Sequence, residues 1–193
     1  MATLNDNLND EELICSVCGS ENEKFFGIMK CNHKDFCLDC IYKLRTFYND
    51  LKCCLCAKIS ENCAIYSKDN PIHNYSNDVD ESNCYKDNVF EKNGIFYTEV
   101  GSYEYIIENT NYKCPFKSCS EPVFNVLNQL MIHVKNKHDV EYCDICLNQN
   151  KNYLSDAMLY KRTQLNSHKI FGEYNDHPSL TIPPHVQCKV SNI

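Results

Sequence analysis

The stretch CSVCGSENEKFFGIMKCNHKDFCLDCIYKLRTFYNDLKCCLC, residues 15–56, decides the fold of this chain. Seven of its cysteines and its histidine follow the pattern C-x2-C, twelve residues, C-x-H-x3-C-x2-C, twelve residues, C-x2-C. These eight residues are Cys15, Cys18, Cys31, His33, Cys37, Cys40, Cys53 and Cys56. A C-x2-C pair turns tightly enough to offer two thiolates to one tetrahedral zinc ion. Eight ligands complete two four-coordinate sites, an arrangement typical of structural zinc, because a hydrolytic zinc keeps a position for water.

The composition supports metal sites rather than disulfides. Fifteen of the 193 residues are cysteine, a content that indicates either a secreted disulfide framework or intracellular metal sites. Residues 1–12, MATLNDNLNDEE, form an acidic tail without the apolar core of a signal peptide. No run approaches the roughly 18 apolar residues that a membrane span needs. We therefore expect a cytoplasmic protein, without membrane contact, whose small modules depend on zinc for folding.

The order of the eight ligands resembles that of the RING finger family, with one histidine in the fourth position. A LIM or treble-clef pattern places its histidine before a different set of C-x2-C pairs. The resemblance implies a RING finger over residues 13–61 in which the two zinc sites interleave. One zinc ion would then be held by Cys15, Cys18, Cys37 and Cys40, and the other by Cys31, His33, Cys53 and Cys56.

The same resemblance implies a docking groove for a ubiquitin-conjugating enzyme. In RING ligases this shallow apolar groove lies between the two zinc loops. The matching positions here are Val17, Ile41, Leu44 and Leu55. For Ile41 and Leu44, on a helix expected over residues 38–48, the alternative is that they fill the small core of the module.

Two positions depart from the common RING pattern. Cys54 stands where a proline usually follows the seventh ligand, and Ala57 stands where many active members have a basic residue after the eighth. Lys58 either substitutes for that basic residue or is an ordinary solvated lysine. The mechanism that the resemblance implies is catalysis by positioning, without a nucleophile on this chain. Cys54, Cys63 and Cys84 are therefore interpreted as free, small hydrophobic residues.

The middle of the chain contains fewer signals. Residues 62–93 are polar and acidic, and we expect an acidic linker there, with no role for His73 or Cys84. Residues 94–111 are expected to form a short strand–helix connector, with a strand at Gly94–Tyr97 and helical turns from Ser102.

A second zinc module is expected over residues 112–139. Its ligands follow the order C-x4-C, then H-x4-H, as Cys114, Cys119, His133 and His138. This order fits a C2H2 finger, in which a β-hairpin precedes a helix that carries both histidines. Phe124 and Leu130 are expected to form its miniature core. Such a unit is unfolded without metal.

A second, irregular C2H2-like finger is expected over residues 140–187. Cys143 and Cys146 open it, and a helix over residues 159–169 ends near His168. We take His185 as the fourth ligand, with His177 as the nearer alternative. Residues 188–193 form a tail that resembles the opening of a truncated third finger. The whole chain is therefore expected to bind about four zinc ions.

The combination of modules has a more specific resemblance. The segments GIFY (94–97), YKCPF (112–116), YCDIC (142–146) and LYKRTQLNSH (159–168) follow the RING in that order. This order resembles the RING and C2H2 ubiquitin ligases that sense collided ribosomes in ribosome-associated quality control. The resemblance implies a RING-type E3 ubiquitin transferase that acts on small-subunit ribosomal proteins. Its partners would be the conjugating enzyme, ubiquitin, and the ribosome with its RNA.

The expected fold class is thus small zinc-stabilised α+β modules, a RING cross-brace followed by C2H2-type ββα fingers. Two other functions stay open, a non-catalytic zinc-finger adaptor and a nucleic-acid-binding protein. One regular finger reads only about three base pairs, which disfavours sequence-specific DNA binding. Residues 112–169 hold eight basic and five acidic side chains in a chain of net charge −7, and the basic ones suit either phosphate contact or solvation. They include Lys113, Lys117, Lys135, Lys137, Lys161 and Arg162.

Overall fold

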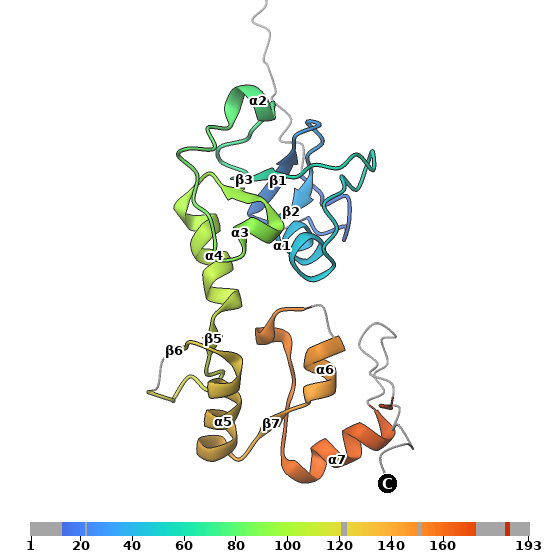
Figure 1. Cartoon of the computed structure of the whole chain (residues 1–193), viewed down its shortest axis with the longest axis vertical. Coiled ribbons are helices and arrows are strands. Elements are labelled where there is room, and N and C mark those ends of the chain that lie inside the picture. The colour runs from blue at the N-terminus through green and yellow to red at the C-terminus, as the bar shows by residue number, and fades with distance from the viewer. Residues whose placement is uncertain (1–12, 22, 121–122, 150–151, 173–183, 186–193) are drawn as a thin grey trace, which may run out of the picture. The chain divides into compact units, whose positions relative to one another are not determined.

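The computed structural model describes residues 13–21, 23–120, 123–149, 152–172 and 184–185 (Figure 1). The chain divides into two compact units, which we call the first unit (Met1–Ile107) and the second unit (Glu108–Ile193). Both combine short strands with short helices, as the expected α+β class requires. Among the described helices, none has the length and apolar character that a membrane crossing needs.

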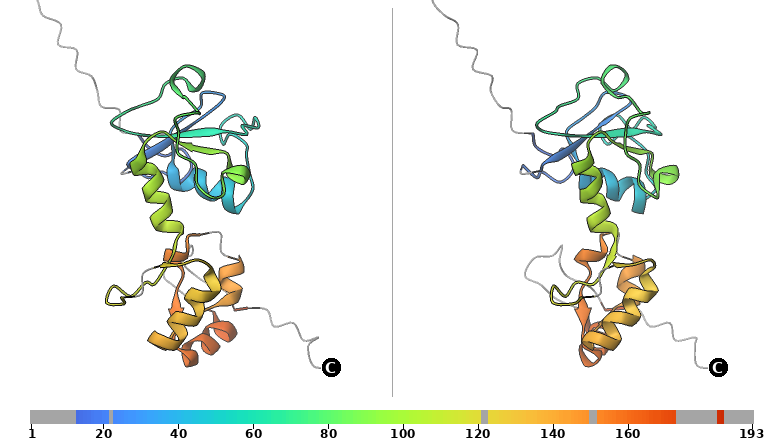
Figure 2. Two further views of the ribbon diagram at one scale, coloured as in Figure 1. Left: turned by 60° about the vertical axis from the view of Figure 1, so that its left-hand side comes forward. Right: turned by 90° about the vertical axis from the view of Figure 1, so that its left-hand side faces the viewer.

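A four-stranded sheet organises the first unit. It consists of β1 (Phe25–Met29), β2 (Phe36–Cys37), β3 (Cys63–Ser67) and β4 (Ile95–Tyr97), in the order β2-β1-β3-β4. Strands β1 and β3 pair antiparallel over five residues each and run side by side in every view, whereas β3 and β4 pair parallel (Figures 1 and 2). Every residue of β1, β3 and β4 is buried, so both faces of the sheet are covered.

The two faces of the sheet pack against different segments. On one face, a cluster forms from strand residues and from two residues of the segment after β3; its members are Phe26, Ile28, Ala64, Tyr66, Phe96, Ile72 and Tyr75. Because side chains alternate along a strand, Gly27 faces the other side. There Ile41 of α1 (Leu38–Tyr42) occupies the space that a side chain at Gly27 would need. The helix therefore approaches β1 closely, and it continues as a π-helical turn, η1 (Lys43–Phe47).

Residues 62–93, which we expected to be a linker, are folded into the first unit. They contain β3, α2 (Tyr75–Asp78) and α3 (Phe90–Asn93). The apolar run Cys63-Ala-Ile-Tyr66 is short and lies among polar residues, so the sequence does not predict a strand there. It nevertheless forms an inner strand of the sheet. The strand and helix expected in the connector correspond to β4 and to α4 (Val100–Thr110).

A buried arginine joins the segments around this sheet. Arg45 of η1 is 1 % exposed. Its guanidinium donates hydrogen bonds to the backbone carbonyls of Ser60 (2.9 Å), Glu61 and Asn93. Buried carbonyls without a partner are costly, so this one side chain stabilises both the loop after the last cysteine pair and the end of α3.

The glycine that ends α3 yields a testable prediction. Gly94 has φ +60, and a Cβ there would meet the carbonyl oxygen of Glu61 and approach Nη2 of Arg45 to 3.2 Å. A left-handed conformation costs an L-residue about 1–2 kcal/mol, and the clash adds to that cost. We expect Gly94→Ala to lower the free energy of unfolding by at least ~2 kcal/mol. Denaturant unfolding of the zinc-loaded chain measures this; Gly19→Ala, at φ +73 with open space around it, is the control that isolates the conformational part. Equal losses for the two variants would contradict the account.

The second unit contains two small hairpin–helix modules. In the first, β5 (Tyr112–Lys113) pairs antiparallel with β6 (Val123–Phe124), and α5 (Leu127–His138) follows. In the second, β7 (Glu141–Tyr142) pairs antiparallel with β8 (Leu159–Tyr160), with α6 (Asp144–Gln149) and the 3-10 turn η2 (Leu154–Asp156) between them and α7 (Arg162–Phe171) after them. Leu130 and Val134 are fully buried in a core that includes Cys114 and Tyr142.

Candidate metal centres

The first cluster of cysteines lies at the edge of the sheet of the first unit. The sulfur atoms of Cys15, Cys18, Cys37 and Cys40 lie within 4.8 Å of one another. Cys15 and Cys18 belong to a tight turn in which Gly19 (φ +73) donates its N–H to the Cys15 carbonyl at 2.8 Å. Cys37 ends β2, Cys40 lies in α1, and the Cys37 N–H donates to the Cys15 sulfur at 3.2 Å.

A second cluster is built on the same turn geometry. It contains Cys31, His33, Cys53 and Cys56, whose ligand atoms also lie within 4.8 Å of one another. Ala57 (φ +57) donates its N–H to the Cys53 carbonyl at 2.8 Å, as Gly19 does in the first turn. Along the chain, ligands one, two, five and six form the first cluster, and ligands three, four, seven and eight form the second. This is the interleaved pairing that the RING resemblance implies.

The second unit holds two further clusters, one in each hairpin–helix module. Cys114, Cys119, His133 and His138 form the first, with Cys114 Sγ 3.4 Å from His138 Nε2 and Cys119 Sγ 3.4 Å from His133 Nε2.

In the other module, Cys143, Cys146, His168 and His185 lie together, with 3.3 Å between Cys143 Sγ and His185 Nε2 and 3.3 Å between Cys146 Sγ and His168 Nε2. The alternative ligand His177 lies outside the described residues.

The distances within the clusters fit zinc. In a tetrahedral site with Zn–S bonds of about 2.3 Å, two sulfur ligands lie about 3.8 Å apart. A sulfur and a nitrogen ligand lie closer together, because the Zn–N bond is shorter. Cys18 Sγ and Cys37 Sγ are 3.8 Å apart, Cys31 Sγ and Cys56 Sγ are 3.6 Å apart, and His33 Nδ1 lies 3.6 Å from Cys53 Sγ. Donor sets of sulfur and imidazole nitrogen select zinc over the hard cations magnesium and calcium.

Burial and neighbouring thiols oppose the ionisation of two of these cysteines when no cation is bound. Side-chain hydrogen bonding to Cys40 and burial raise the pKa of Cys37, and burial raises the pKa of Cys31 to about 11, with the neighbouring thiols adding to the effect. Burial also opposes ionisation of Cys15, but backbone N–H groups, that of Cys37 foremost, lower its pKa to about 7. Four thiols packed this closely cannot all ionise unless a cation compensates their charge, and zinc supplies that charge when it is bound.

We expect zinc content to report on all four clusters. The intact chain should bind four zinc ions, measured by mass spectrometry under native conditions. Cys143→Ser should lower the number to three, because a site that loses one of its ligands binds zinc far more weakly. Cys84→Ser is the control, since Cys84 is in none of the four clusters. Three zinc ions in the unmodified chain, or three in the Cys84 variant, would contradict the assignment.

The expected docking residues differ in exposure. Val17 and Leu55 lie at the tips of the two C-x2-C turns of the first unit and are 45 % and 57 % exposed. Leu44 is half-buried and the Lys58 side chain is exposed. Ile41 is only 1 % exposed and packs against Gly27, so its burial favours the alternative interpretation, that it fills the core of the module.

Sequence reasoning missed several residues around the clusters. Tyr48 and Ile59 are large, exposed apolar side chains close in sequence to the expected groove residues. Asn32, between the ligands Cys31 and His33, has φ +61, and its side-chain oxygen accepts a hydrogen bond from the Tyr75 N–H at 2.8 Å. The segment after β3 therefore holds the turn of the second cluster. In the sequence, the tolerance of asparagine for positive φ is a weak signal of this role.

The remaining cysteines do not join the clusters among the described residues. Cys54 is exposed, Cys63 is fully buried in β3, and Cys84 is half-buried. Burial raises the pKa of the Cys63 thiol to about 11, although the nearby Arg45 works in the opposite direction. A thiol of raised pKa is a poor nucleophile at neutral pH, in keeping with the interpretation of Cys63 as a small hydrophobic residue.

Comparisons with known proteins find similarity to two E3 ubiquitin-protein ligases. No protein-family model and no solved structure matches it. The chain is 26 % identical over 186 residues to the E3 ubiquitin-protein ligase hel2 of Schizosaccharomyces pombe, covering 95 % of this chain and 24 % of that protein. It is 24 % identical over 173 residues to the E3 ubiquitin-protein ligase ZNF598 of Danio rerio, covering 86 % of this chain and 16 % of that protein. The chain thus spans a quarter or less of the length of these relatives. The resemblance to this group of proteins is confirmed: over most of its length, the chain is a homologue of E3 ubiquitin-protein ligases.

Proposed function

We propose that this chain is a RING-type E3 ubiquitin ligase, with residues 15–56 as its RING. The observation that carries the proposal is the pair of interleaved Cys/His clusters with Val17 and Leu55 exposed at the tips of their two turns. Apolar side chains at loop tips gain no burial within the unit, and they suit a partner that covers both. The names of the two relatives support the same activity.

The proposed mechanism uses positioning rather than a nucleophile on this chain. The two clusters would hold zinc, which would fix the two turns when bound. Val17, Leu55 and Leu44 bind the conjugating enzyme that carries ubiquitin as a thioester. Holding the thioester and the attacking substrate lysine together converts a bimolecular encounter into an effectively unimolecular step. In this scheme the substrate amine forms an amide bond with ubiquitin, and the thioester bond between ubiquitin and the conjugating enzyme's cysteine breaks. No thiol of this chain takes part.

The finger modules are proposed to direct the ligase to its target. We assign C2H2-type fingers to residues 112–139 and 140–187, each closed by two cysteines and two histidines. By similarity to the relatives, the target is proposed to be small-subunit ribosomal proteins of stalled or collided ribosomes, in the cytoplasm. The proposed RING module includes more chain than residues 13–61, since β3, β4 and part of α4 belong to the same unit.

Ubiquitin chain formation with a panel of conjugating enzymes tests the activity. The zinc-loaded chain, ubiquitin, activating enzyme and ATP should give polyubiquitin with at least one member of the panel. A parallel reaction after removal of zinc by a chelator should give none, because the turns that carry Val17 and Leu55 lose their support. No chains with any conjugating enzyme would contradict the proposal.

A non-catalytic adaptor is the second candidate, and Ala57 is the observation that favours it. An alanine after the eighth ligand cannot supply the charged hydrogen bonds that a basic residue there would give to ubiquitin and the conjugating enzyme. The turn that contains Ala57 is nevertheless intact, since the Cys53 N–H donates to the Lys58 carbonyl at 2.9 Å.

A substitution at Ala57 separates a weak ligase from an adaptor. We expect Ala57→Arg to raise the rate of chain formation about tenfold, the equivalent of one charge-assisted hydrogen bond. Arginine brings no new backbone strain, since alanine already adopts φ +57 there with a Cβ. Ala57→Gln, of similar length without charge, is the matched control. An adaptor would stay inactive in both variants, so an inactive Ala57→Arg would favour the second candidate.

A further inference from the structure

The helix that carries Leu44 contains one irregular turn. Helix α1 continues as η1, in which the Tyr48 N–H donates to the Lys43 carbonyl at 3.3 Å, a spacing of five residues instead of the four of an α-helix. Such π-helical turns are rare, and they occur frequently at functional sites. This turn decides which side chains face outward at the C-terminal end of the helix.

An uninterrupted α-helix would turn Tyr48 toward the interior. Ile41 and Arg45 are each 1 % exposed, and Tyr48 is the next position in the i, i+4, i+7 pattern of a buried face. The π turn contains more residues than an α turn, so it rotates the residues that follow out of this pattern. Thr46 is buried instead, and Tyr48 is 60 % exposed. Four residues are close to one full π turn, so Tyr48 faces the same side as the half-buried Leu44.

Two residues of α3 hold the π turn from outside the Cys/His pattern. Helix α3 packs beside η1. The Lys92 ammonium donates to the Thr46 carbonyl at 2.7 Å, and the side-chain amide of Asn93 donates to the Thr46 hydroxyl at 3.3 Å. Asn93 is fully buried, and its backbone carbonyl accepts from Arg45. These bonds fix Thr46 as the buried residue of the turn, so the outward position of Tyr48 depends on them.

The backbone after Tyr48 is fixed as well. Asn49 has φ +53, a left-handed conformation that asparagine tolerates, and the Asp50 N–H donates to the Leu44 carbonyl at 3.0 Å. The Asp50 carboxylate accepts from the Lys52 N–H at 3.0 Å. The ring of Tyr48 therefore projects from a backbone that is held on both sides. A preorganised contact of this kind loses little conformational freedom on binding, which favours affinity.

The Tyr48 side chain is suited to a protein partner. In the part of the chain that the structure describes, no hydrogen bond or ring contact engages this side chain. Tyrosine is enriched at protein interfaces, because its ring is large and apolar while its hydroxyl can bond to polar groups at the rim. Through Leu44, the exposed ring is continuous with the proposed docking groove. The same partner can therefore cover both side chains.

We propose that Tyr48 extends the docking groove and contacts the same conjugating enzyme as Leu44, with Lys92 and Asn93 as positioning residues that hold the π turn. The inference rests on the proposed function, because the groove is the proposed site of the conjugating enzyme. It adds a contact beyond the positions that the RING resemblance implies. Because the ring supplies the added affinity, conjugating enzymes with an apolar surface opposite Tyr48 are bound more tightly than others.

Binding of labelled, uncharged conjugating enzymes to the zinc-loaded full chain measures this contact by fluorescence anisotropy. For the enzyme that binds most tightly, we expect Tyr48→Ala to raise the Kd about tenfold or more, as is typical for the loss of a central aromatic contact. Tyr48→Phe keeps the ring and should bind nearly as tightly as the unmodified chain. Both variants should retain four zinc ions.

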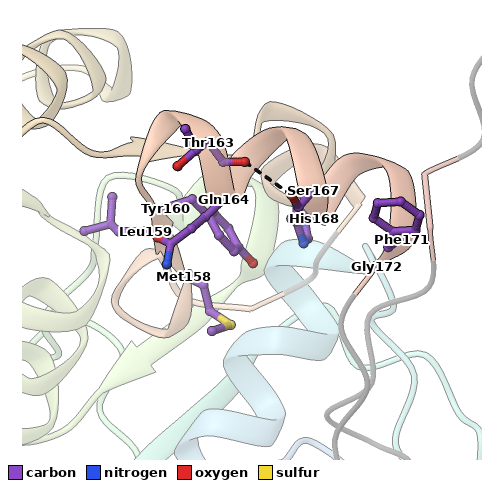
Figure 3. A pocket seen from close by; sticks show the side chains of 9 residues that line it. All are labelled: Met158, Leu159, Tyr160, Thr163, Gln164, Ser167, His168, Phe171 and Gly172. Atoms are coloured by element: carbon purple, nitrogen blue, oxygen red, sulfur yellow. Dashed lines mark hydrogen bonds between the residues drawn. The ribbon is translucent and has the colours of Figure 1, made fainter.

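Phe171 provides the matched control. It lies at the end of α7, where it lines a groove of the second unit, and it is 66 % exposed, close to the value for Tyr48 (Figure 3). Phe171→Ala removes an exposed ring of similar size and leaves the first unit untouched, so the Kd for the conjugating enzyme should not change. Equal losses in Phe171→Ala and Tyr48→Ala would overturn the inference, because they would indicate non-specific adhesion of exposed rings.

The positioning role of Lys92 is tested separately. Lys92→Met removes the hydrogen bond to Thr46 and keeps the length of the side chain. We expect it to raise the Kd about threefold, the equivalent of one modest hydrogen bond, and Lys92→Arg, which can still donate, to restore most of the affinity. In a double-mutant cycle, Lys92→Met should have little effect in the Tyr48→Ala background, because Lys92 acts through Tyr48. Full additivity would show that Lys92 does not position Tyr48.

The outcomes distinguish this inference from the proposed function, since discharge of ubiquitin to free lysine is measured on the same variants. Discharge by the unmodified chain with an unchanged Kd for Tyr48→Ala would overturn the Tyr48 contact without contradicting the ligase. Binding that Tyr48→Ala weakens, in a chain that accelerates no discharge, would support the contact and contradict the ligase. Absence of binding to every conjugating enzyme would overturn both.

Two further results would overturn the Tyr48 contact alone. Loss of zinc in Tyr48→Ala would show that the ring serves the fold. Dissociation of a dimer of the chain in Tyr48→Ala, measured by sedimentation, would show that the ring contacts a second copy of the chain instead.

Discussion

Val17→Arg is expected to reduce ubiquitin chain formation about 100-fold or more while leaving the zinc content at four. Val17 is at the tip of the first C-x2-C turn, 45 % exposed, so an arginine there can reach water in the free protein. In the complex, the same charge would be buried against an apolar partner surface without a counter-ion. Losses of about 3 kcal/mol, or two orders of magnitude, are typical when a central interface contact is replaced in this way.

The control for this variant lies on the same turn. Ser16 is exposed beside Val17, and its backbone N–H donates to the Asp35 carbonyl at 2.8 Å. Ser16→Arg should therefore keep most of the activity. Full activity in Val17→Arg would show that the turn tip is not a docking site. Loss of zinc in Val17→Arg would show that the side chain is structural instead.

A chain that ends at residue 61 is expected not to fold, even with zinc, whereas a chain that ends at residue 111 should fold. The shorter chain contains all eight ligands of the proposed RING but lacks β3 and β4. These strands contribute Ile65, Tyr66, Ile95, Phe96 and Tyr97, all nearly or fully buried. At about 1.5–3 kcal/mol for each buried large apolar side chain, their removal costs roughly 10 kcal/mol, as much as the whole stability of a typical domain.

The two truncated chains are compared by circular dichroism, by zinc content and by denaturant unfolding. The longer chain should hold two zinc ions and unfold cooperatively. The shorter chain should lack a cooperative transition, because Phe26 and Ile28 lose the strands they pack with and the carbonyl of Asn93 is no longer there for Arg45. A shorter chain that binds two zinc ions and unfolds cooperatively would show that residues 13–61 are a sufficient RING.

The metal clusters could be predicted from the sequence because the local part of each is encoded in a few residues. A C-x2-C pair is positioned by one turn, and the left-handed residue after it, Gly19 or Ala57, completes the turn. The interleaving of the two clusters depends on contacts between distant segments, and it was predicted only through the resemblance to the RING family. The sequence left both His177 and His185 open as the fourth ligand of the last module, with His185 preferred for its place in the segment PHVQC (184–188). The structure places His185 beside Cys143 and Cys146.

Other features of the first unit were not predictable because they depend on long-range packing. Strand β3 contains a four-residue apolar run in a polar stretch, and it becomes a strand only because β1 and β4 bind both of its edges. Arginine side chains are mostly exposed in proteins, yet the guanidinium of Arg45 is buried among backbone carbonyls. Ile41 had two interpretations, a contact in the docking groove or a place in the core. Its close packing against Gly27 in the facing strand favours the core.

The most direct measurement of the central claim is the discharge of ubiquitin from a charged conjugating enzyme to free lysine. In this single-turnover assay, no substrate protein is needed and only positioning of the thioester is tested. We expect the zinc-loaded chain to accelerate discharge at least about tenfold with one or more conjugating enzymes, and the Val17→Arg variant to leave the spontaneous rate unchanged. A fully zinc-loaded chain that accelerates discharge from no conjugating enzyme would contradict the assignment as a RING ligase.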